Sequence, residues 1–485
     1  MNYDMIRYVL FRAFSLVGAL MLLPVLVALI YGEMSCALIF GVMALVTLLI
    51  GFAGTCKKPE NRMFYAREGY VMCALIWLLI SLLGALPFVL TGTIPSYVDA
   101  LFETVSGFTT TGASILTSVD GMYMSVQFFR CFTHWIGGMG VLVFMLAIIP
   151  MSGGSTMHLM RAESPGPSVG KLVPRVKNTA KMLYLIYFGL TVAQIVLLLV
   201  TGLNLYEAMT ITFSTVGTGG FSITDAGMNA YPLAAQIVVI LFMTLCGINF
   251  SVYYLIQTGK IREALKSEEL RWYLSILFAS SVLIAANVIF AGRADSAFDA
   301  FHHALFSVSS VMTTTGFATR DFNLWPQFSR TLLFILTLLG ASAGSTGGGL
   351  KVSRLIIMVR RIKNEIIFAT HRKSVRQVYM DGRRVGSTTV KSVTTYVSIY
   401  VLVYLVSFLL ISLDGLDFET NITAVAATLN NVGPGLSAVG PTGNYAQYSI
   451  LSKLVLCFDM LAGRLEFIPL MILLRYRTWS ERRTV

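Results

Sequence analysis

The sequence is poor in charge. Only 12% of its 485 residues are Asp, Glu, Lys or Arg, whereas 56% are hydrophobic. An average soluble domain has about 25% charged residues, so this composition argues against a water-soluble protein. A cleavable signal is also missing, because the first apolar run is too long and no small-residue cleavage site precedes a soluble domain. We therefore expect the chain to lie in a bilayer and to keep its first helix.

Cysteine and histidine are scarce, with six and five residues. No two cysteines stand at metal or redox spacing, and we interpret them as small buried hydrophobic residues: Cys36, Cys56, Cys73, Cys131, Cys246 and Cys457. His134, His302 and His303 have no neighbouring metal ligands, which favours a hydrogen-bonding role over a proton relay. No nucleophile with a base and no paired acids lie within the apolar spans, so an intramembrane hydrolase is not expected. The sequence indicates neither an enzyme nor a bound cofactor.

Long apolar stretches are abundant. A helix needs about 20 apolar residues to cross the hydrocarbon core of a membrane. Stretches of this kind predict an all-α, multi-pass membrane protein rather than one with a single anchor, and occur around 8–30, 35–54, 70–92, 182–202, 232–256, 272–291 and 392–413.

We attribute the formal net charge of +12 to the orientation of the chain in the membrane, with basic connections on one side. The basic residues lie in connections between apolar spans without interleaved exposed aromatics, so no nucleic acid is expected as a partner. They lie at Arg7, Arg12, 57–67, 161–181, 260–271, 351–391 and 475–483. The connections between them are acidic, with Glu33, Asp99, Glu103, Asp120, Glu207, Asp225, Asp295, Asp299, Asp321, Asp414, Asp417 and Glu419. The positive-inside rule then places the basic connections and both termini in the cytoplasm.

One unit recurs four times along the chain. It consists of an apolar span, an acidic residue that opens a short semi-polar helix, a tip rich in Ser, Thr and Gly, and another apolar span. The tips contain Gly112, Gly220, Gly316 and Gly433. We expect an N-terminal helix pair in 1–68, followed by repeats at 69–165, 166–265, 266–388 and 389–485, of which the third carries a Gly-rich intramembrane loop.

Each short helix is too brief and too polar at its tip to span the bilayer, so it is expected to enter from outside and return. Backbone that leaves helical hydrogen bonding at membrane depth survives only when it is buried in protein or faces water. Four re-entrant tips therefore predict a central aqueous path.

The tips suit an alkali cation. Backbone carbonyls can replace the water shell of such an ion without the tight hold of a fixed charge, and glycine permits the backbone angles that turn successive carbonyls to one side. Threonine hydroxyls at Thr110, Thr111, Thr314 and Thr315 can add ligands, and no carboxylate is present at any tip. The short helices direct their negative ends at the path, and Asp99, Glu207 and Glu419 are expected as caps at the opposite ends.

With these tips, the sequence resembles the Trk/Ktr/HKT superfamily of cation transporters over nearly its whole length, and within it the membrane subunits of bacterial Trk potassium uptake systems. The matching stretches are FTTTGAS (108–114), STVGTGGFS (214–222), TTTGF (313–317), TLNNVGPGL (428–436), AGSTGGGLKV (343–352) and AGRLEF (462–467). The resemblance implies four pseudo-symmetric helix, pore-loop, helix units around one pore. It also implies a homodimer in the cytoplasmic (inner) membrane and a cytoplasmic, nucleotide-binding regulatory subunit resembling TrkA.

The resemblance further implies a potassium site, formed by the backbone of Thr110, Thr111 and Gly112; Thr218, Gly219 and Gly220; Thr314, Thr315 and Gly316; and Asn431, Val432 and Gly433. In plant relatives, serine in place of the first-loop glycine is associated with sodium transport, so Gly112 favours potassium. Thr218 departs from the pattern, because many relatives carry an apolar residue there.

Two further features suggest a gate, namely a Gly-rich loop composed of Gly344, Ser345, Thr346, Gly347, Gly348 and Gly349, and the intramembrane Arg464. The loop lacks the terminal Gly-Lys-Ser/Thr of a phosphate-binding P-loop. Adjacent glycines predict a break in a helix, and the resemblance implies that this break can block the path. A charge at the depth of Arg464 is costly and usually functional, although pairing with Asp459 or Glu466 is the structural alternative.

Three alternatives stay open from sequence alone. Asn249 can line the path or form a hydrogen bond between helices. The connection 351–391 can face lipid as a solvated segment or contact an acidic regulatory subunit. Lastly, the protein can be an ion-coupled secondary transporter of potassium or sodium, which would place ionisable groups at its substrate site. The tips lack such groups, which favours channel-like conduction.

Overall fold

The computed structural model describes residues 1–61, 63–140, 176–371, 374 and 376–480. The expected boundary between the first two repeats, at 165, and most of the basic segment 161–181 lie outside the described residues. Within them the protein is helical, apart from a short antiparallel hairpin in which β1 (Tyr379–Met380) pairs with β2 (Arg383–Arg384).

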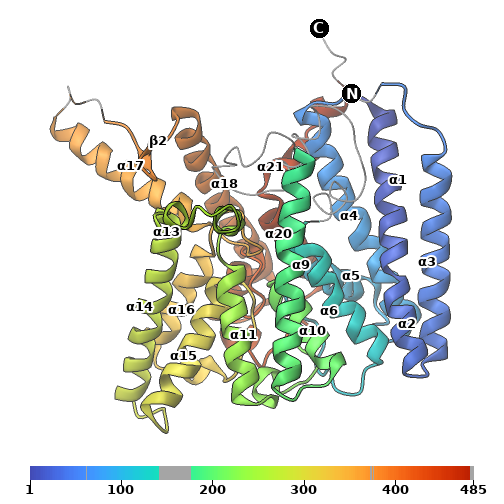
Figure 1. Ribbon diagram of the computed structural model, residues 1–485, viewed down its shortest axis with the longest axis horizontal. Coiled ribbons are helices and arrows are strands. Elements are labelled where there is room, and N and C mark those ends of the chain that lie inside the picture. The colour runs from blue at the N-terminus through green and yellow to red at the C-terminus, as the bar shows by residue number, and fades with distance from the viewer. Residues whose placement is uncertain (62, 141–175, 372–373, 375, 481–485) are drawn as a thin grey trace.

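The N-terminal helices form the expected pair. The helices α1 (Tyr3–Leu20) and α2 (Leu22–Ile30) together form one span, and α3 (Met34–Thr55) returns beside them. All three helices contact α4 (Ala66–Leu90) or α6 (Met124–Gly138) of the first unit, and the pair lies at one edge of the molecule in Figure 1.

Four units follow, each with an outer helix, a pore helix and an inner helix. The outer helices are α4 (Ala66–Leu90), α9 (Val176–Val200), α14 (Glu268–Phe290) and α18 (Ser387–Ile411). The pore helices are α5 (Tyr97–Phe108), α10 (Leu205–Val216), α15 (Ala297–Met312) and α19 (Phe418–Leu429). The inner helices are α6 (Met124–Gly138), α11 (Leu233–Cys246), α16 (Gln327–Leu339) and α20 (Ile450–Leu465).

The remaining helices connect these units. They are α12 (Phe250–Gln257), α13 (Ile261–Leu265), α17 (Val352–Thr370), α21 (Ile468–Leu474) and α22 (Tyr476–Ser480), with 3-10 turns at Gly227–Ala230, Phe322–Leu324, Ser412–Asp414 and Ser437–Val439. In Figure 1 the N-terminus, α13, α17 and α21 lie toward one face, and the pore helices α5, α10 and α15 lie farther toward the opposite face. The basic connections at 260–271 and 351–391 belong to the first of these faces.

The units form a closed ring. The inner helix of each unit contacts the pore helix of the next, in the pairs α6 with α10, α11 with α15, α16 with α19, and α20 with α5. Three of these contacts include a polar bridge from the fourth residue of the inner helix. The bridges are Gln236–His302 at 2.8 Å, Arg330–Glu419 at 2.5 Å and Lys453–Asp99 at 2.6 Å.

The pore helices are capped differently from what was expected. The capping side chains belong to Ser96, Asn204, Ser296 and Asp417, each of which accepts from the backbone N–H three residues later. The expected caps Asp99, Glu207 and Glu419 lie inside the first turn. Glu207 still contributes to capping, because it accepts from Asn204 N at 3.2 Å and completes a capping box. A cap needs non-helical backbone and a short side chain, and the acids are still favourable near the positive helix end.

Six helices within the described residues are long and apolar enough to cross a membrane, and a bent pair would make a seventh. The bent pair corrects the expected straight span 232–256, because the chain turns by 90° between α11 and α12. Asn249 caps α12 by accepting from Ser251 N at 2.9 Å, so the new helix begins in a new direction. The cysteine interpretation holds for five residues and is wrong for Cys56, which is exposed just beyond α3.

Candidate functional site

The four tips share one backbone conformation. Their first residues have φ of 56° at Thr110, 56° at Thr218, 59° at Thr314 and 56° at Asn431. Their third residues are the four glycines, with φ between 76° and 93°. Positive φ is uncommon for a non-glycine residue and an outlier for a β-branched one, so its repetition in four loops indicates that the surroundings impose it. Thr218, which departs from the family pattern, has the same backbone as the others.

The glycines are required by close contacts between neighbouring tips. A Cβ atom on Gly112 would lie 1.9 Å from the carbonyl oxygen of Gly219, and one on Gly220 would lie 1.9 Å from that of Thr315. The contacts continue around the ring, with 2.2 Å from Gly316 to the oxygen of Val432 and 2.6 Å from Gly433 to that of Thr111.

Each glycine therefore faces the carbonyl that precedes the glycine of the next tip, and the fourth tip closes on the first. We call this arrangement the tip ring. It brings together all twelve residues expected at the ion site, and every one that carries a polar side chain is fully buried.

Hydrogen bonds of the side chains hold the tips in place. The hydroxyls of Thr111 and Thr315 lie 2.8 Å from those of Thr109 and Thr313. The amide nitrogen of Asn431 donates to Thr111 Oγ1 and to Met460 O, both at 2.9 Å. The fourth tip is thus tied both to the first tip and to its own inner helix.

A buried ion pair supports the first two tips, and sequence reasoning missed it. Arg130 on α6 contacts Glu103 on α5 at 2.5 Å, and Arg130 also donates to Ser222 O beyond the second tip at 2.9 Å. Glu103 accepts from Ser114 Oγ and Ile115 N beyond the first tip. Glu103 was expected in an acidic connection, but it is buried in α5. The available signal was a charge of opposite sign, Arg130, in the next apolar part of the same unit.

The histidines have hydrogen-bonding roles. His134 Nδ1 lies 2.8 Å from Gly107 O, and its Nε2 accepts from Phe221 N at 3.3 Å, so the ring bridges the first and second loops. His302 bonds Gln236, and His303 lies 2.8 Å from Thr319 Oγ1. Among the described residues, no group of three or more His, Cys, Asp or Glu could hold a metal ion.

The Gly-rich loop lies directly against the third and fourth tips. The helix α16 ends at Leu339, and Gly348 N donates to Thr314 Oγ1 at 2.7 Å. A Cβ on Gly347 would lie 2.8 Å from Thr313 O, and one on Gly348 would lie 2.4 Å from Asn430 O. Glycine is therefore needed here for close backbone approach as well as for interrupting the helix.

Two buried charges hold this loop, and neither was identified from sequence. Lys351 Nζ donates to Gly347 O and, at 2.9 Å, to Gly348 O. One oxygen of Glu269 on α14 accepts from Ala343 N at 2.7 Å and Ser353 N at 3.1 Å, which pins both ends of the loop.

Asn249 belongs to the same network. Its amide donates to the other oxygen of Glu269 at 3.3 Å. The structure thus gives Asn249 a hydrogen bond between helices, one of the two roles considered for it.

Arg464 was expected in the middle of a span, but it lies at a helix end. It is the penultimate residue of α20, because Glu466 and Phe467 have φ of 57° and 64° and break the helix. Its guanidinium donates to Thr346 O at 2.9 Å, to Gly138 O at 2.7 Å and to Gly137 O, with a longer contact of 3.4 Å to Thr110 Oγ1. It therefore joins the first tip, the end of α6 and the Gly-rich loop.

The two acids considered as partners of Arg464 have other contacts. Glu466 forms an ion pair with Arg354 in the first turn of α17, and Arg354 also lies 3.8 Å from the ring centroid of Tyr396. Asp459 accepts from Ser407 Oγ at 2.6 Å. The break after α20 is consequently tied to the helix that follows the Gly-rich loop.

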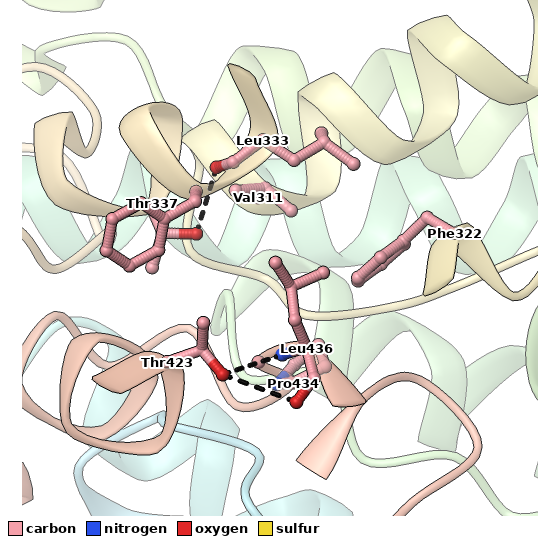
Figure 2. Close-up of a pocket in the computed structure, with 9 residues that line it drawn as sticks. Val311, Phe322, Leu333, Thr337, Thr423, Pro434 and Leu436 are labelled. Atoms are coloured by element: carbon pink, nitrogen blue, oxygen red, sulfur yellow. Dashed lines mark hydrogen bonds between the residues drawn. The ribbon is translucent and has the colours of Figure 1, made fainter. Parts of the chain in front are cut away.

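A small recess lies beside the fourth tip, between α16 and the chain that leaves the tip (Figure 2). Val311, Phe322, Leu333, Pro434 and Leu436 supply most of its lining. Thr423 Oγ1 inside it accepts from Leu436 N at 2.9 Å. The recess lies between the third and fourth units, and the hydroxyls of Thr337 and Thr423 in its lining already donate to Leu333 O and Leu436 O.

Comparison with known proteins agrees with this geometry. Residues 39–482 match the TrkH family, described as a cation transport protein. The chain is 35% identical to the Trk system potassium uptake protein TrkH of Salmonella typhimurium, over 95% of this chain and 96% of that protein. It is 30% identical to TrkI of Halomonas elongata, over 95% and 94%. The crystal structure of the potassium transporter TrkH from Vibrio parahaemolyticus superposes with a TM-score of 0.88 at 31% identity, covering 99% of this chain and all of that one.

Proposed function

This chain belongs to the TrkH family of cation transport proteins, and we propose that potassium crosses it through the tip ring. Its function is potassium uptake across a membrane. The observation that carries the proposed path is the closed ring of glycine-to-carbonyl contacts, since four loops with one backbone conformation meet there.

The chemistry of the ring suits potassium. Backbone carbonyls and threonine hydroxyls can replace the hydration shell of the ion, and the pore helices direct their negative ends at the tips. No residue of the tips is ionisable. A coupled secondary transporter would place ionisable groups at its substrate site, so we propose channel-like conduction.

The gate in this proposal has two parts, the Gly-rich loop and Arg464. The loop contacts the third and fourth tips, and Arg464 donates both to this loop and to the end of α6. A guanidinium stays charged at physiological pH, so it repels a passing cation as long as it remains on the path.

The surroundings of the pore also belong to the proposal. The repeats run over 69–165, 166–265, 266–388 and 389–485. The protein lies in the cytoplasmic (inner) membrane with both termini in the cytoplasm, as the basic connections favour. It acts as a homodimer, one pore in each protomer. The basic segment 351–391, with α17 and the hairpin, lies on the cytoplasmic face, where it is available to lipid headgroups and to a nucleotide-binding regulatory subunit.

Two variants test the path. Gly112→Ser would bring a side chain against the carbonyl of Gly219 and is expected to raise the sodium-to-potassium permeability ratio measured in proteoliposomes. Shortening Gly347–Gly349 is expected to raise basal potassium flux without changing that ratio. An unchanged ratio in Gly112→Ser would remove Gly112 from the path, and lower flux in a well-folded loop variant would reduce the loop to a structural kink.

A further inference from the structure

The first residue of each tip carries a side-chain oxygen, and these oxygens have unequal partners. Thr110, Thr218, Thr314 and Asn431 occupy this position with nearly equal φ and are fully buried. Three of them, Thr110, Thr314 and Asn431, lie against Arg464 or the Gly-rich loop.

Two of the four oxygens are bound by the gate. Thr314 Oγ1 accepts from Gly348 N at 2.7 Å, and Thr110 Oγ1 receives the longer contact of 3.4 Å from Arg464. The N–H groups of the gate therefore occupy two side-chain oxygens that could otherwise bind a cation.

A third oxygen has no hydrogen-bond partner among the described residues. It is Oδ1 of Asn431, whose Nδ2 is fully engaged with Thr111 and Met460. This oxygen lies between Gly348 of the Gly-rich loop and Gly463 on α20, because added Cβ atoms would lie 3.1 Å and 2.9 Å from it. Burying a polar oxygen without a partner is costly, which points to a ligand for it.

We propose that Thr110 Oγ1, Thr314 Oγ1 and Asn431 Oδ1 form an innermost site for a dehydrated alkali cation, and that the gate and potassium compete for it. The proposal rests on the potassium path through the tip ring. Because binding equilibria are reciprocal, a gate that occupies Thr314 Oγ1 and Thr110 Oγ1 weakens potassium binding, and potassium bound to these two oxygens and to Asn431 Oδ1 releases the gate. The transported ion then opens its own exit.

The fourth oxygen provides an internal comparison. Thr218 Oγ1 stands at the same tip position, but its hydroxyl donates to Gly217 O at 2.7 Å. Thr218→Val thus removes a side-chain oxygen at this position of the tip that bonds Gly217 O rather than the gate. Thr314→Val removes an oxygen that both the gate and the ion would use.

The test follows the gate by cysteine labelling rather than by flux. Ser345→Cys places a reporter in the Gly-rich loop, and Cys56→Ser removes the one exposed cysteine of the described residues. Purified full-length protein is labelled with a maleimide in potassium chloride and in choline chloride at equal ionic strength. We expect potassium to raise the initial labelling rate about threefold to tenfold, the range that one hydrogen bond covers.

The variants distinguish loss of the oxygen shared by gate and ion from a general loosening of the Gly-rich loop. In Thr314→Val we expect fast labelling in choline and no further rise in potassium, whereas Thr314→Ser and Thr218→Val keep the potassium dependence. Gly348→Ala retains every oxygen but cannot seat against Asn430 O, so it is also fast in choline. If Thr314→Val does not fold, the comparison of potassium with choline on the reporter protein decides the matter.

Equal labelling of the reporter in potassium and choline would overturn the shared site, as would a potassium response retained in Thr314→Val. Potassium flux and the effect of Gly112→Ser are measured on the same reporter protein. If flux and selectivity behave as proposed while labelling ignores potassium, the shared site is wrong and the path stands. If selectivity does not depend on Gly112, the path itself is wrong.

Discussion

The outer and inner halves of the four units differ in their symmetry. Between the start of each pore helix and its tip, the units are alike, with a polar cap, a first-turn acid and the same two left-handed residues in the tip. Below the tips the inner helices end in different ways. The helix α11 bends into α12, α16 gives way to the Gly-rich loop, and α20 breaks at two left-handed residues.

This difference separates two tasks. An ion bound by equivalent carbonyls from four tips requires the same backbone conformation in each tip. A change in one tip therefore disturbs a site that the other three share. In the proposed function, a gate needs only one obstruction that can move, and we assign this role to the Gly-rich loop and Arg464, which belong to the third and fourth units. Variants in the outer half should therefore alter selectivity, and variants in the inner half should alter how often the path is open.

The largest effect is expected from alanine at the ring glycines. Overpacking at a site without free space costs about 1–3 kcal/mol, or about tenfold or more in uptake. Gly112→Ala and Gly220→Ala, with Cβ contacts of 1.9 Å, should lose more potassium uptake than Gly433→Ala at 2.6 Å. The control is Gly121→Ala, which has φ of 80° but nothing within 4 Å of its Cβ. Equal losses at Gly121 and Gly112 would show that the clash is irrelevant.

Arg464→Ala tests the inner half. At about 6 Å and an effective dielectric near 20, the repulsion between two unit charges is roughly 3 kcal/mol, and screening reduces it. We expect about tenfold higher potassium flux in proteoliposomes and an unchanged sodium-to-potassium ratio. Arg475→Ala, at an exposed arginine beyond α21, should leave flux unchanged. A folded Arg464→Ala protein with wild-type flux would place this arginine off the ion path.

A smaller effect is expected for Glu269→Gln. The amide is isosteric but carries no charge, and it accepts more weakly from the two N–H groups at the ends of the Gly-rich loop. Basal flux should rise about threefold, which corresponds to roughly one hydrogen bond. The neighbouring Glu268, paired with Arg360 at 2.8 Å on α17, provides the control in Glu268→Gln. Higher flux in the control alone would assign the effect to α17.

The bridge between Lys453 and Asp99 joins the last unit to the first. Its side chains are 9% and 27% exposed, so a double-mutant cycle with Lys453→Met and Asp99→Asn should give a coupling of about 1 kcal/mol in stability. The bridge between Lys260 and Glu263, with side chains 57% and 62% exposed, should give almost none. Similar couplings at both places would indicate that closing the ring contributes nothing through this contact.

The smallest effect concerns pH. The pKa of Asp225 in an outer connection is lowered, chiefly by the hydroxyl of Ser118 and further by Val119 N. A lowered pKa means that the folded state favours the carboxylate, so its contribution is present at neutral pH and is lost as pH falls through that pKa. Asp225→Asn should therefore lower Tm slightly at neutral pH and not in acid. An equal decrease at both pH values would assign the effect to lost packing.

Most of the architecture could be predicted from sequence, and the misses have physical reasons. Apolar length and the positions of Gly112, Gly220, Gly316 and Gly433 predict spans and tips because both follow from local chain chemistry. The break at Glu466 and Phe467 could not be predicted, since neither residue favours left-handed backbone. That break moves Arg464 from mid-span to a helix end.

The contacts of Glu269 and Lys351 with the Gly-rich loop could not be predicted from sequence either. Glu269 and Lys351 stand at the edges of apolar stretches, where a charge usually reaches water. Only the folded chain brings them to backbone groups of the Gly-rich loop, across 74 residues in the case of Glu269 and Ala343. The acids expected to cap the pore helices lie within three residues of the actual caps. The capping residue itself could not be predicted, because it is the one whose backbone is not yet helical.

The closure of the tip ring has a consequence for the making of the protein. The last contact of the ring joins Gly433 to the oxygen of Thr111, and the bond from Asn431 to Thr111 spans 320 residues. Synthesis proceeds from the N-terminus, so a chain emerging from the ribosome holds three quarters of a ring until its final fifth has entered the bilayer. A copy whose synthesis is unfinished therefore lacks the contacts that close the ring, because both sides of the closure are present only once the fourth unit has been made.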